Sequence, residues 1–214
     1  MIELYSIWKQ YEKPHWALTN ISLTVEKGEF YFISGPSGSG KTTLLKLIYR
    51  EIFPTQGQII VDRRNTLRIP DHKIYSLRRI MGIVFQDFRL LFNKTVFENV
   101  AIVLHILGMP RKKIKRKVFN ALRMVSLHHK LWEYPSRISY GEQQRVAIAR
   151  AIVNNPKIIL ADEPTGNLDP ELAFEIMSLF KEINKQGTTV IVATHEKELI
   201  HQFSNKIFLL SKEH

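Results

Sequence analysis

The chain has 214 residues, 44% of them hydrophobic and 24% charged, which is the composition of a globular domain large enough to bury a sizeable core. Its 31 Lys and Arg residues against 20 Asp and Glu residues give a formal net charge of +11, which favours anionic partners such as nucleotides, nucleic acid or an anionic membrane surface. No cysteine is present, so disulfides and thiolate metal sites are excluded and a reducing compartment is favoured.

The first 85 residues contain mainly strand signals. Apolar alternation and turn residues predict strands over 2–11, 17–25, 29–34, 57–61 and 80–85, with a glycine-rich loop and a helix over 41–50 among them. Residues 1–11 lack the apolar core of a signal peptide, and no apolar run approaches the ~20 residues that cross a bilayer. We therefore expect a cytoplasmic location, with any membrane contact made through the protein surface or a partner.

From about residue 87 to residue 156 the strand signals disappear, and helical spacing of apolar residues predicts helices over 96–107, 111–125 and 141–154. Strands and helices then alternate again, over 157–161, 171–186, 188–193, 196–203 and 206–210. Strands that alternate with helices predict an α/β fold with a mainly parallel sheet. The helical stretch 87–156 predicts a subdomain inserted into a single domain of residues 1–214.

A phosphate-binding motif lies between the predicted strand at 29–34 and the predicted helix at 41–50. Residues 35–42, GPSGSGKT, satisfy the pattern G-x-x-x-x-G-K-[ST]. Glycines let such a loop wrap around phosphates, and backbone amides at the helix start attract the anion. We expect Lys41 to neutralise the β- and γ-phosphates of ATP and the Thr42 hydroxyl to bind Mg²⁺. The predicted nucleotide contacts are Gly35, Pro36, Ser37, Gly38, Ser39, Gly40, Lys41, Thr42 and Thr43.

Two carboxylates, Asp162 and Glu163, end the hydrophobic segment that begins at Ile158. Ligands of an α/β sheet gather at the carboxyl ends of its parallel strands. We therefore expect Asp162 to hold Mg²⁺ and Glu163 to act as the general base on an attacking water. Alone, the pair could equally be a solvated turn before Pro164, but the phosphate-binding motif favours a catalytic role.

Five further motifs complete a pattern that resembles the ABC ATPases over essentially the whole chain. They are Tyr11, Gln86 after Val84-Phe85, the segment 138–145 (ISYGEQQR), Asn167-Leu168-Asp169, and His195 after Ala193-Thr194. The resemblance implies a P-loop ABC ATPase nucleotide-binding domain with an antiparallel β subdomain and an inserted α-helical subdomain. It also implies that ATP and Mg²⁺ are the ligands.

The resemblance implies roles for three of these motifs within one chain. Gln86 would sense the nucleotide site, contact Mg²⁺ and take part in catalysis. His195 would reach the γ-phosphate during hydrolysis. Tyr11 would stack on adenine, although either of two nearby tryptophans, Trp8 and Trp16, could take the base instead.

The segment 138–145 looks like the signature motif of this family, which usually reads L-S-G-G-[QE]. Ser139, Gly141 and Glu142 would contact the nucleotide of a partner subunit, because the two sites in this family form only across a head-to-tail homodimer that closes on ATP. This chain has Tyr140 where the family has its first glycine. If only Gly141 needs close backbone approach, Tyr140 merely adds bulk, and Tyr140→Gly should leave ATPase activity unchanged or higher.

Within the family, the stretches 85–91, 95–102 and 160–169 are similar to those of bacterial ATPases that act in cell division. They are shared in part with ATPases of lipoprotein-release and macrolide-export systems. The first resemblance implies an integral membrane partner, which would hold this ATPase on the inner face of the plasma membrane and relay its cycle to cell-wall remodelling.

Two surface features have two readings each. An apolar run follows Gln86 and consists of Phe88, Leu90, Leu91 and Phe92. The sequence favours equally a binding site for the membrane partner and a core position between the subdomains. The basic run 111–117, RKKIKRK, is a solvated helix face or a contact with anionic lipid headgroups.

Two other classes of protein were weighed. The net charge permits a nucleic-acid-associated ABC ATPase, but a long coiled-coil insertion and a second ATPase domain are missing, so we expect no nucleic-acid partner. A non-catalytic nucleotide-binding module is disfavoured because Lys41, Asp162, Glu163 and His195 are all present.

Overall fold

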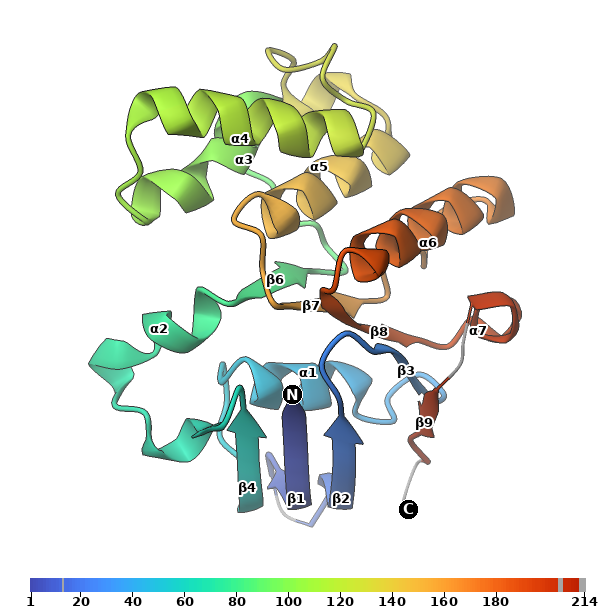
Figure 1. The fold of residues 1–214 in the computed structure, drawn as a ribbon. Coiled ribbons are helices and arrows are strands. Elements are labelled where there is room, and N and C mark those ends of the chain that lie inside the picture. The colour runs from blue at the N-terminus through green and yellow to red at the C-terminus, as the bar shows by residue number, and fades with distance from the viewer. Residues whose placement is uncertain (13, 204–205, 212–214) are drawn as a thin grey trace.

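The computed structural model describes residues 1–12, 14–203 and 206–211, which form two β-sheets with helices around them (Figure 1). The antiparallel sheet has the order β2-β1-β4-β5 and consists of β2 (Trp16–Val25), β1 (Ile2–Gln10), β4 (Gln56–Val61) and β5 (Arg64–Asn65). The parallel sheet has the order β6-β7-β8-β3-β9 and consists of β6 (Met81–Val84), β7 (Ile158–Asp162), β8 (Thr189–Thr194), β3 (Phe30–Ser34) and β9 (Ile207–Leu209).

One helix, α1 (Lys41–Ile48), packs between the two sheets. It contacts β7 and β8 of the parallel sheet and β2 and β4 of the antiparallel sheet. Side chains alternate across each strand, so Leu160 of β7 faces this core, whereas Ile159 and Ala161 face a second core beneath the other helices. Burial on both faces explains why β7 reads as an unbroken apolar run that ends at the first carboxylate.

Three helices lie above the parallel sheet in Figure 1, namely α3 (Val96–Ile106), α4 (Arg111–Met124) and α5 (Tyr140–Ile152). Both α3 and α5 begin with a capping box. Thr95 and Glu98 exchange side-chain and backbone hydrogen bonds at the start of α3, and Ser139 and Glu142 do the same at the start of α5. These caps determine the residue at which each helix begins. α5 is called the signature helix below, because it begins within the signature segment 138–145.

The remaining helices flank the sheets. α6 (Pro170–Lys185) contacts β8, and α7 (Lys197–Phe203) packs on α6. α2 (Tyr75–Arg78) lies between β5 and β6, together with single 3₁₀ turns at Thr66–Arg68 and Asp71–Lys73; another turn, Pro135–Arg137, precedes α5. Within the described part of the chain, no helix has the length and apolar character needed to cross a bilayer.

The predicted fold class is confirmed, with an antiparallel sheet, a parallel sheet and an inserted set of helices. The longer elements end within about two residues of their predicted limits, as is usual for frayed ends. β5, α2 and the 3₁₀ turns were not predicted, because two to four residues carry too little periodicity to be recognised.

Candidate nucleotide-binding and catalytic site

The phosphate-binding loop joins the end of β3 to the first turn of α1. Gly40 directly precedes the helix with φ of +94°, and a Cβ added there would lie 2.5 Å from the Ala17 carbonyl oxygen. Only glycine fits this position, because any other residue would be strained at this positive φ and its Cβ would clash with the Ala17 carbonyl oxygen. The loop therefore presents its backbone and the amide end of α1 to the same space.

The ammonium group of Lys41 is turned inward, and the residue is only 6% exposed. Nζ donates to the carbonyl oxygens of Gly35 (2.8 Å) and Pro36 (3.2 Å) and forms an ion pair with Glu163 Oε1 at 3.3 Å. A buried charge of this kind needs partners of opposite sign or polar oxygens, and Lys41 has both. It can exchange these contacts for phosphate oxygens, which are stronger acceptors.

Thr42 and Asp162 meet at the end of β7. The Thr42 hydroxyl donates to Asp162 Oδ1 at 3.1 Å, although the two residues are 120 positions apart in the chain. Burial raises the pKa of Asp162 above its ordinary value of 3.8, and the hydrogen bond from Thr42 opposes that rise. Hydroxyl and carboxylate oxygens at this spacing are the hard donors that Mg²⁺ prefers, so the donor set fits the ion.

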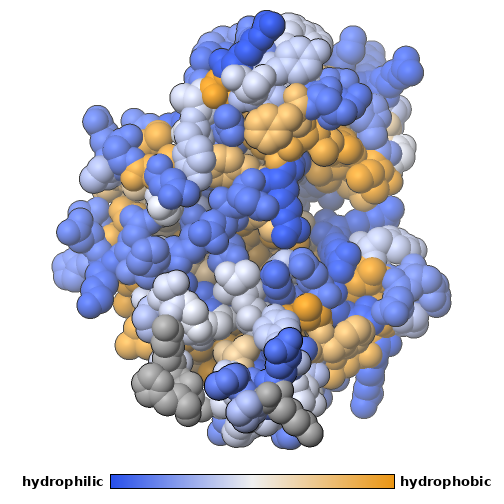
Figure 2. Space-filling view, turned by 180° about the vertical axis from the view of Figure 1, so that it is seen from behind, coloured by the Kyte–Doolittle hydropathy of each residue, from blue (hydrophilic) through white to orange (hydrophobic). Residues whose placement is uncertain are grey.

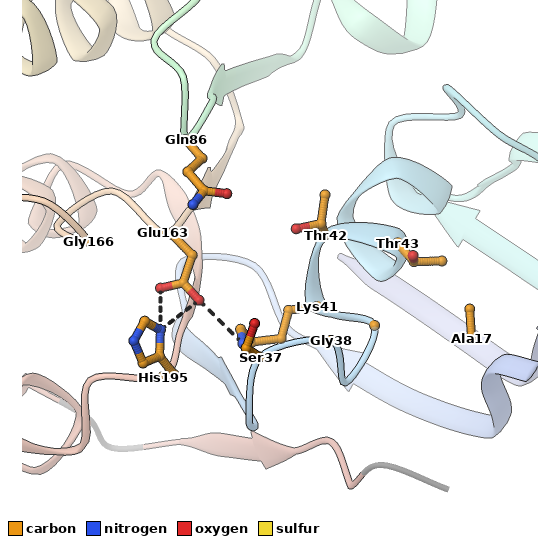
Figure 3. A pocket seen from close by; sticks show the side chains of 11 residues that line it. Ala17, Ser37, Gly38, Lys41, Thr42, Thr43, Gln86, Glu163, Gly166 and His195 are labelled. Carbon is orange, nitrogen blue, oxygen red and sulfur yellow. Dashed lines mark hydrogen bonds and ion pairs between the residues drawn. The ribbon is translucent and has the colours of Figure 1, made fainter. Parts of the chain in front are cut away.

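Glu163 lies between Lys41 and His195, as Figure 3 shows. His195 Nδ1 is 3.0 Å from each carboxylate oxygen of Glu163. Glu163 adopts φ of +44°, an uncommon conformation for a residue with a side chain, while its amide donates to the Ala193 carbonyl oxygen at 2.8 Å. Such a held, strained residue is typical of functional positions.

A cavity of about 300 Å³ opens in front of the loop (Figure 3). Its lining residues are Ala17, Ser37, Gly38, Gly40, Lys41, Thr42, Thr43, Gln86, Glu163, Gly166 and His195. The sequence had not singled out Ala17 and Gly166 as site residues, because neither carries a chemical group that would mark it. Gly35, Pro36 and Ser39 belong to the loop but do not line the cavity, and Ser39 is only 3% exposed.

A second cavity of about 470 Å³ adjoins the first at Thr42 and Gln86, which line both. Asp162, Tyr140 and Asn167 also line it. Gln86 therefore lies beside both the Glu163 side and the Asp162 side of the site. This position places an amide within the region where the predicted metal and the attacking water would be held.

Tyr11 follows β1 and is 57% exposed. Its hydroxyl lies 3.3 Å from Thr43 Oγ1, and the Lys9 ammonium lies 5.0 Å from the centre of its ring. Trp8 and Trp16 instead pack edge to face on each other, with ring centres 5.3 Å apart. Tyr11 thus contacts Thr43, which lines the first cavity, although Tyr11 itself lines neither cavity.

Ser139, Gly141 and Glu142 lie at the start of α5 and line neither cavity. Glu142 accepts from the Ser139 amide (2.9 Å) and pairs with Lys130 Nζ (2.6 Å). Partial burial alone would raise the pKa of Glu142, but these hydrogen bonds outweigh it and lower the pKa below its ordinary value. One chain therefore brings the loop, the carboxylates and His195 together, and leaves the signature residues apart from them.

Gly141, not Tyr140, is the signature position with little room for a side chain. A Cβ added to Gly141 would lie 2.2 Å from Leu172 Cδ2 of α6. Tyr140 begins α5 and is not among the described residues with positive φ, so its side chain causes no strain of that kind. Gly141 is therefore the more crowded of the two positions, and the expectation that it alone needs close backbone approach stays a prediction.

Two residues of the apolar run after Gln86 are core residues, and the other two are exposed, so the run fits each of the two predicted roles only in part. Phe88 and Leu90 are buried at 7% exposure each, in the core beneath the helices. Leu91 is 38% and Phe92 60% exposed. No single socket is formed by the four residues together.

Comparison with known proteins gives a consistent result. The ABC transporter family model matches residues 18–166. The cell division ATP-binding protein FtsE of Bacillus subtilis is 47% identical over 98% of this chain and 92% of its own length. The dimeric structure of a bacterial ABC transporter cassette superposes with a TM-score of 0.90 at 39% identity, covering 99% of this chain and 94% of that one. The structure of the same cassette in a post-hydrolysis state, bound to ADP and Pi, superposes with a TM-score of 0.90 at 37% identity. The superposition covers 100% of this chain and 97% of that one.

Proposed function

This chain belongs to the ABC transporter family and is an ABC ATPase, and we propose that it hydrolyses ATP with Glu163 as the general base. The observation that carries the proposal is the position of the Glu163 carboxylate, in contact with Lys41 of the phosphate loop on one side and with His195 on the other. A general base at that point lies beside the phosphate that Lys41 would bind, and the His195 imidazole can orient the Glu163 carboxylate.

Residues of the two cavities, and Tyr11 beside them, would each have one role in phosphoryl transfer. Lys41 and the loop amides hold the phosphates, and Tyr11 receives the adenine. Thr42 and Asp162, with Gln86 beside them, would hold Mg²⁺, which supplies positive charge against the phosphate oxygens. Glu163 and His195 position the water, so that placement and charge stabilisation lower the barrier.

Glu163→Gln tests the base. The variant should still bind ATP, because Lys41 and the loop are unchanged, but kcat should fall by about 10²–10⁴-fold. Glu182→Gln is the matched control, since Glu182 is an exposed residue of α6 paired with Lys185. ATP binding by fluorescence and phosphate release under the same conditions separate the two effects. Normal turnover by Glu163→Gln would remove Glu163 as the base.

We also propose that two chains close head to tail on ATP. Within one chain Ser139 and Gly141 lie apart from the phosphate loop, so a phosphate at the amide end of α5 would have to come from another chain. A second subunit in that orientation would supply it. Light scattering should find Glu163→Gln dimeric with ATP and monomeric with ADP; a monomer in both would contradict the proposal.

We propose that the chain acts in cell division as the FtsE-type partner of an FtsX-like integral membrane protein, and that this partner holds it at the inner face of the plasma membrane. The similarity to FtsE along nearly the whole chain supports this function. An apolar groove of about 590 Å³ between α2 and α3 supports a docking place for that partner. Figure 2 shows hydrophobic side chains beside a hollow between the helical subdomain and the part of the molecule below it.

Ile106 at the end of α3 lines this groove and is 77% exposed. Phe92 of the run after Gln86 is 60% exposed but does not line the groove. Ile106→Asp should abolish co-purification with the membrane protein while leaving ATPase activity intact, because a carboxylate in an apolar interface is costly. Phe92→Asp is the comparison: if it alone breaks the complex, the partner docks at the exposed end of the run instead.

We further propose that the first turns of α4 contact anionic lipid beside the partner. The α4 cations of residues 111–117 have no carboxylate within ion-pair distance among the described residues, and α4 begins shortly after Leu107, which lines the groove. Changing these cations to Gln should abolish binding to anionic vesicles. Equal binding of the unmodified protein to anionic and neutral vesicles would contradict the lipid contact.

A further inference from the structure

Tyr140 occupies the signature position where the family has glycine, and its side chain contacts two other loops of the same chain. Its ring centre lies 4.5 Å from that of Phe88, with the planes inclined at 56°. Its hydroxyl oxygen accepts a hydrogen bond from Asn167 Nδ2 at 2.8 Å. A glycine at this position could make neither contact, so Tyr140 does more than add bulk.

The Phe88 side of this contact is rigidly held. Phe88 and Arg89 both have positive φ, +57° and +49°, directly after the Gln86 segment. Arg150 of α5 donates one hydrogen bond to the Phe88 carbonyl oxygen and another to that of Arg89, at 2.6 Å for the latter. Two consecutive left-handed residues persist only when their surroundings fix them. Phe88 therefore gives Tyr140 a fixed platform.

The Asn167 side belongs to the turn that leads from Glu163 to α6. The Gly166 amide donates to the Glu163 carbonyl oxygen at 3.3 Å, and the Asp169 carboxylate caps α6 by accepting from the Leu172 amide at 2.9 Å. Asn167 lies between these two anchored points. A bond to its side chain therefore restrains the turn that begins at the catalytic carboxylate.

Tyr140 and Asn167 also line the cavity that contains Thr42, Gln86 and Asp162. The start of α5 thus reaches the metal side of the site in its own chain, although Ser139 and Gly141 do not. Tyr140 is half-exposed, at 42%, so its hydroxyl is held by the Asn167 contact and not by close packing.

We propose that Tyr140 is a positioning residue: it fixes the turn at Asn167 against the segment after Gln86, and so holds Glu163 in place for hydrolysis. The inference rests on the proposed ATPase function. The contact joins the signature helix, which would serve the site of the partner subunit, to the catalytic turn of its own subunit. This coupling reverses the sequence-based expectation for Tyr140→Gly, which should now lower activity.

Tyr140→Phe removes the hydroxyl and keeps the ring. The variant should lower kcat about three- to tenfold and leave KM for ATP unchanged, because one hydrogen bond to the turn is lost while the phosphate loop is untouched. Tyr140→Gly should lower kcat further. Tyr134→Phe is the matched control, since Tyr134 is exposed to a similar degree (41%) and lines neither cavity.

Asn167→Ala removes the other half of the hydrogen bond, and the double variant closes a thermodynamic cycle. If the two groups act through their contact, Tyr140→Phe with Asn167→Ala should be no slower than the slower single variant. Fully additive losses, or Tyr140→Phe with unchanged kcat, would overturn the proposal. Thermal unfolding of each variant shows whether a loss of activity reflects loss of fold.

Hydrogen exchange separates this inference from the proposed function. Amides of residues 165–168 should exchange several-fold faster in Tyr140→Phe than in Tyr134→Phe, whether or not the protein hydrolyses ATP. Equal exchange in the two variants would overturn the positioning role. Absence of ATP hydrolysis by the unmodified protein would instead refute the ATPase proposal and leave the exchange result standing.

Discussion

Lys41 Nζ and Glu163 Oε1 form an ion pair at 3.3 Å, in which neither residue is more than 10% exposed. Lys41 belongs to the phosphate-binding motif and begins α1, and Glu163 follows β7, so the pair joins the two motifs that carry the predicted chemistry. In the proposed mechanism, Glu163 would act on water only when Lys41 no longer holds it as strongly. Phosphate oxygens that attract Lys41 would therefore also release the base.

Lys41→Ala should weaken ATP binding by about ten- to hundredfold, since a charged hydrogen-bond donor to the phosphates is lost. Hydrolysis should fall at least as far, because the released Glu163 then has no positioned phosphate beside it. Lys185→Ala is the control: Lys185 is 71% exposed and pairs with Glu182 of its own helix. Titration of each variant with a fluorescent ATP analogue measures the effect, and unchanged affinity in Lys41→Ala would contradict this role.

His195→Ala should lower kcat by about 10²-fold with little change in ATP affinity, because the imidazole contacts Glu163 and not the phosphate loop. His201→Ala provides the comparison, since His201 is an exposed residue of α7 away from both cavities. Steady-state phosphate release over a range of ATP concentrations separates kcat from KM. A rise in KM alone would assign His195 to nucleotide binding instead.

Much of this site could be predicted from sequence because its chemistry lies in short motifs at strand ends. The loop before α1 and the carboxylates after β7 meet simply because parallel strands bring their carboxyl ends to one edge. Strand and helix patterns with caps, such as the Ser139–Glu142 box, likewise locate their own ends. These features depend on local spacing, which a single sequence contains.

Other features depend on contacts between distant segments and could not be predicted. Nothing in the sequence indicates that Tyr140 accepts from Asn167, or that Phe88 is buried while Phe92 is exposed. The apolar groove proposed for docking includes Tyr75 of the four-residue helix α2, which is too short to give a periodic signal. Tertiary packing decides each of these cases.

Two capping boxes allow the catalytic and structural effects of a cap to be separated. Ser139→Ala and Thr95→Ala should each lower the free energy of unfolding by about 1 kcal/mol, because each removes an N-cap acceptor. Only Ser139→Ala should also lower ATPase activity, by about 10²-fold, if its helix start serves a γ-phosphate. Denaturant unfolding and phosphate release check the two effects. Equal activity losses would show that helix stability alone matters.

Asp162 and Asp62 should respond to amide substitution in opposite directions at neutral pH. Burial raises the pKa of Asp162, so its contribution to stability is largest at low pH and falls as pH rises through its folded-state pKa. A hydrogen bond from Lys157 lowers the pKa of Asp62, so its contribution is present above the unfolded-state value and lost as pH falls through the folded-state pKa.

Asp162→Asn should therefore raise Tm at pH 7 while abolishing Mg²⁺-dependent hydrolysis, because the ion loses its carboxylate ligand. Asp62→Asn should lower Tm at pH 7, by an amount worth up to about 1 kcal/mol for a partly exposed pair, and leave hydrolysis unchanged. Thermal unfolding between pH 3 and pH 8 should show the two variants converging with the unmodified protein in acid. A lower Tm for Asp162→Asn at pH 7 would show that its charge stabilises the fold, contrary to the burial argument.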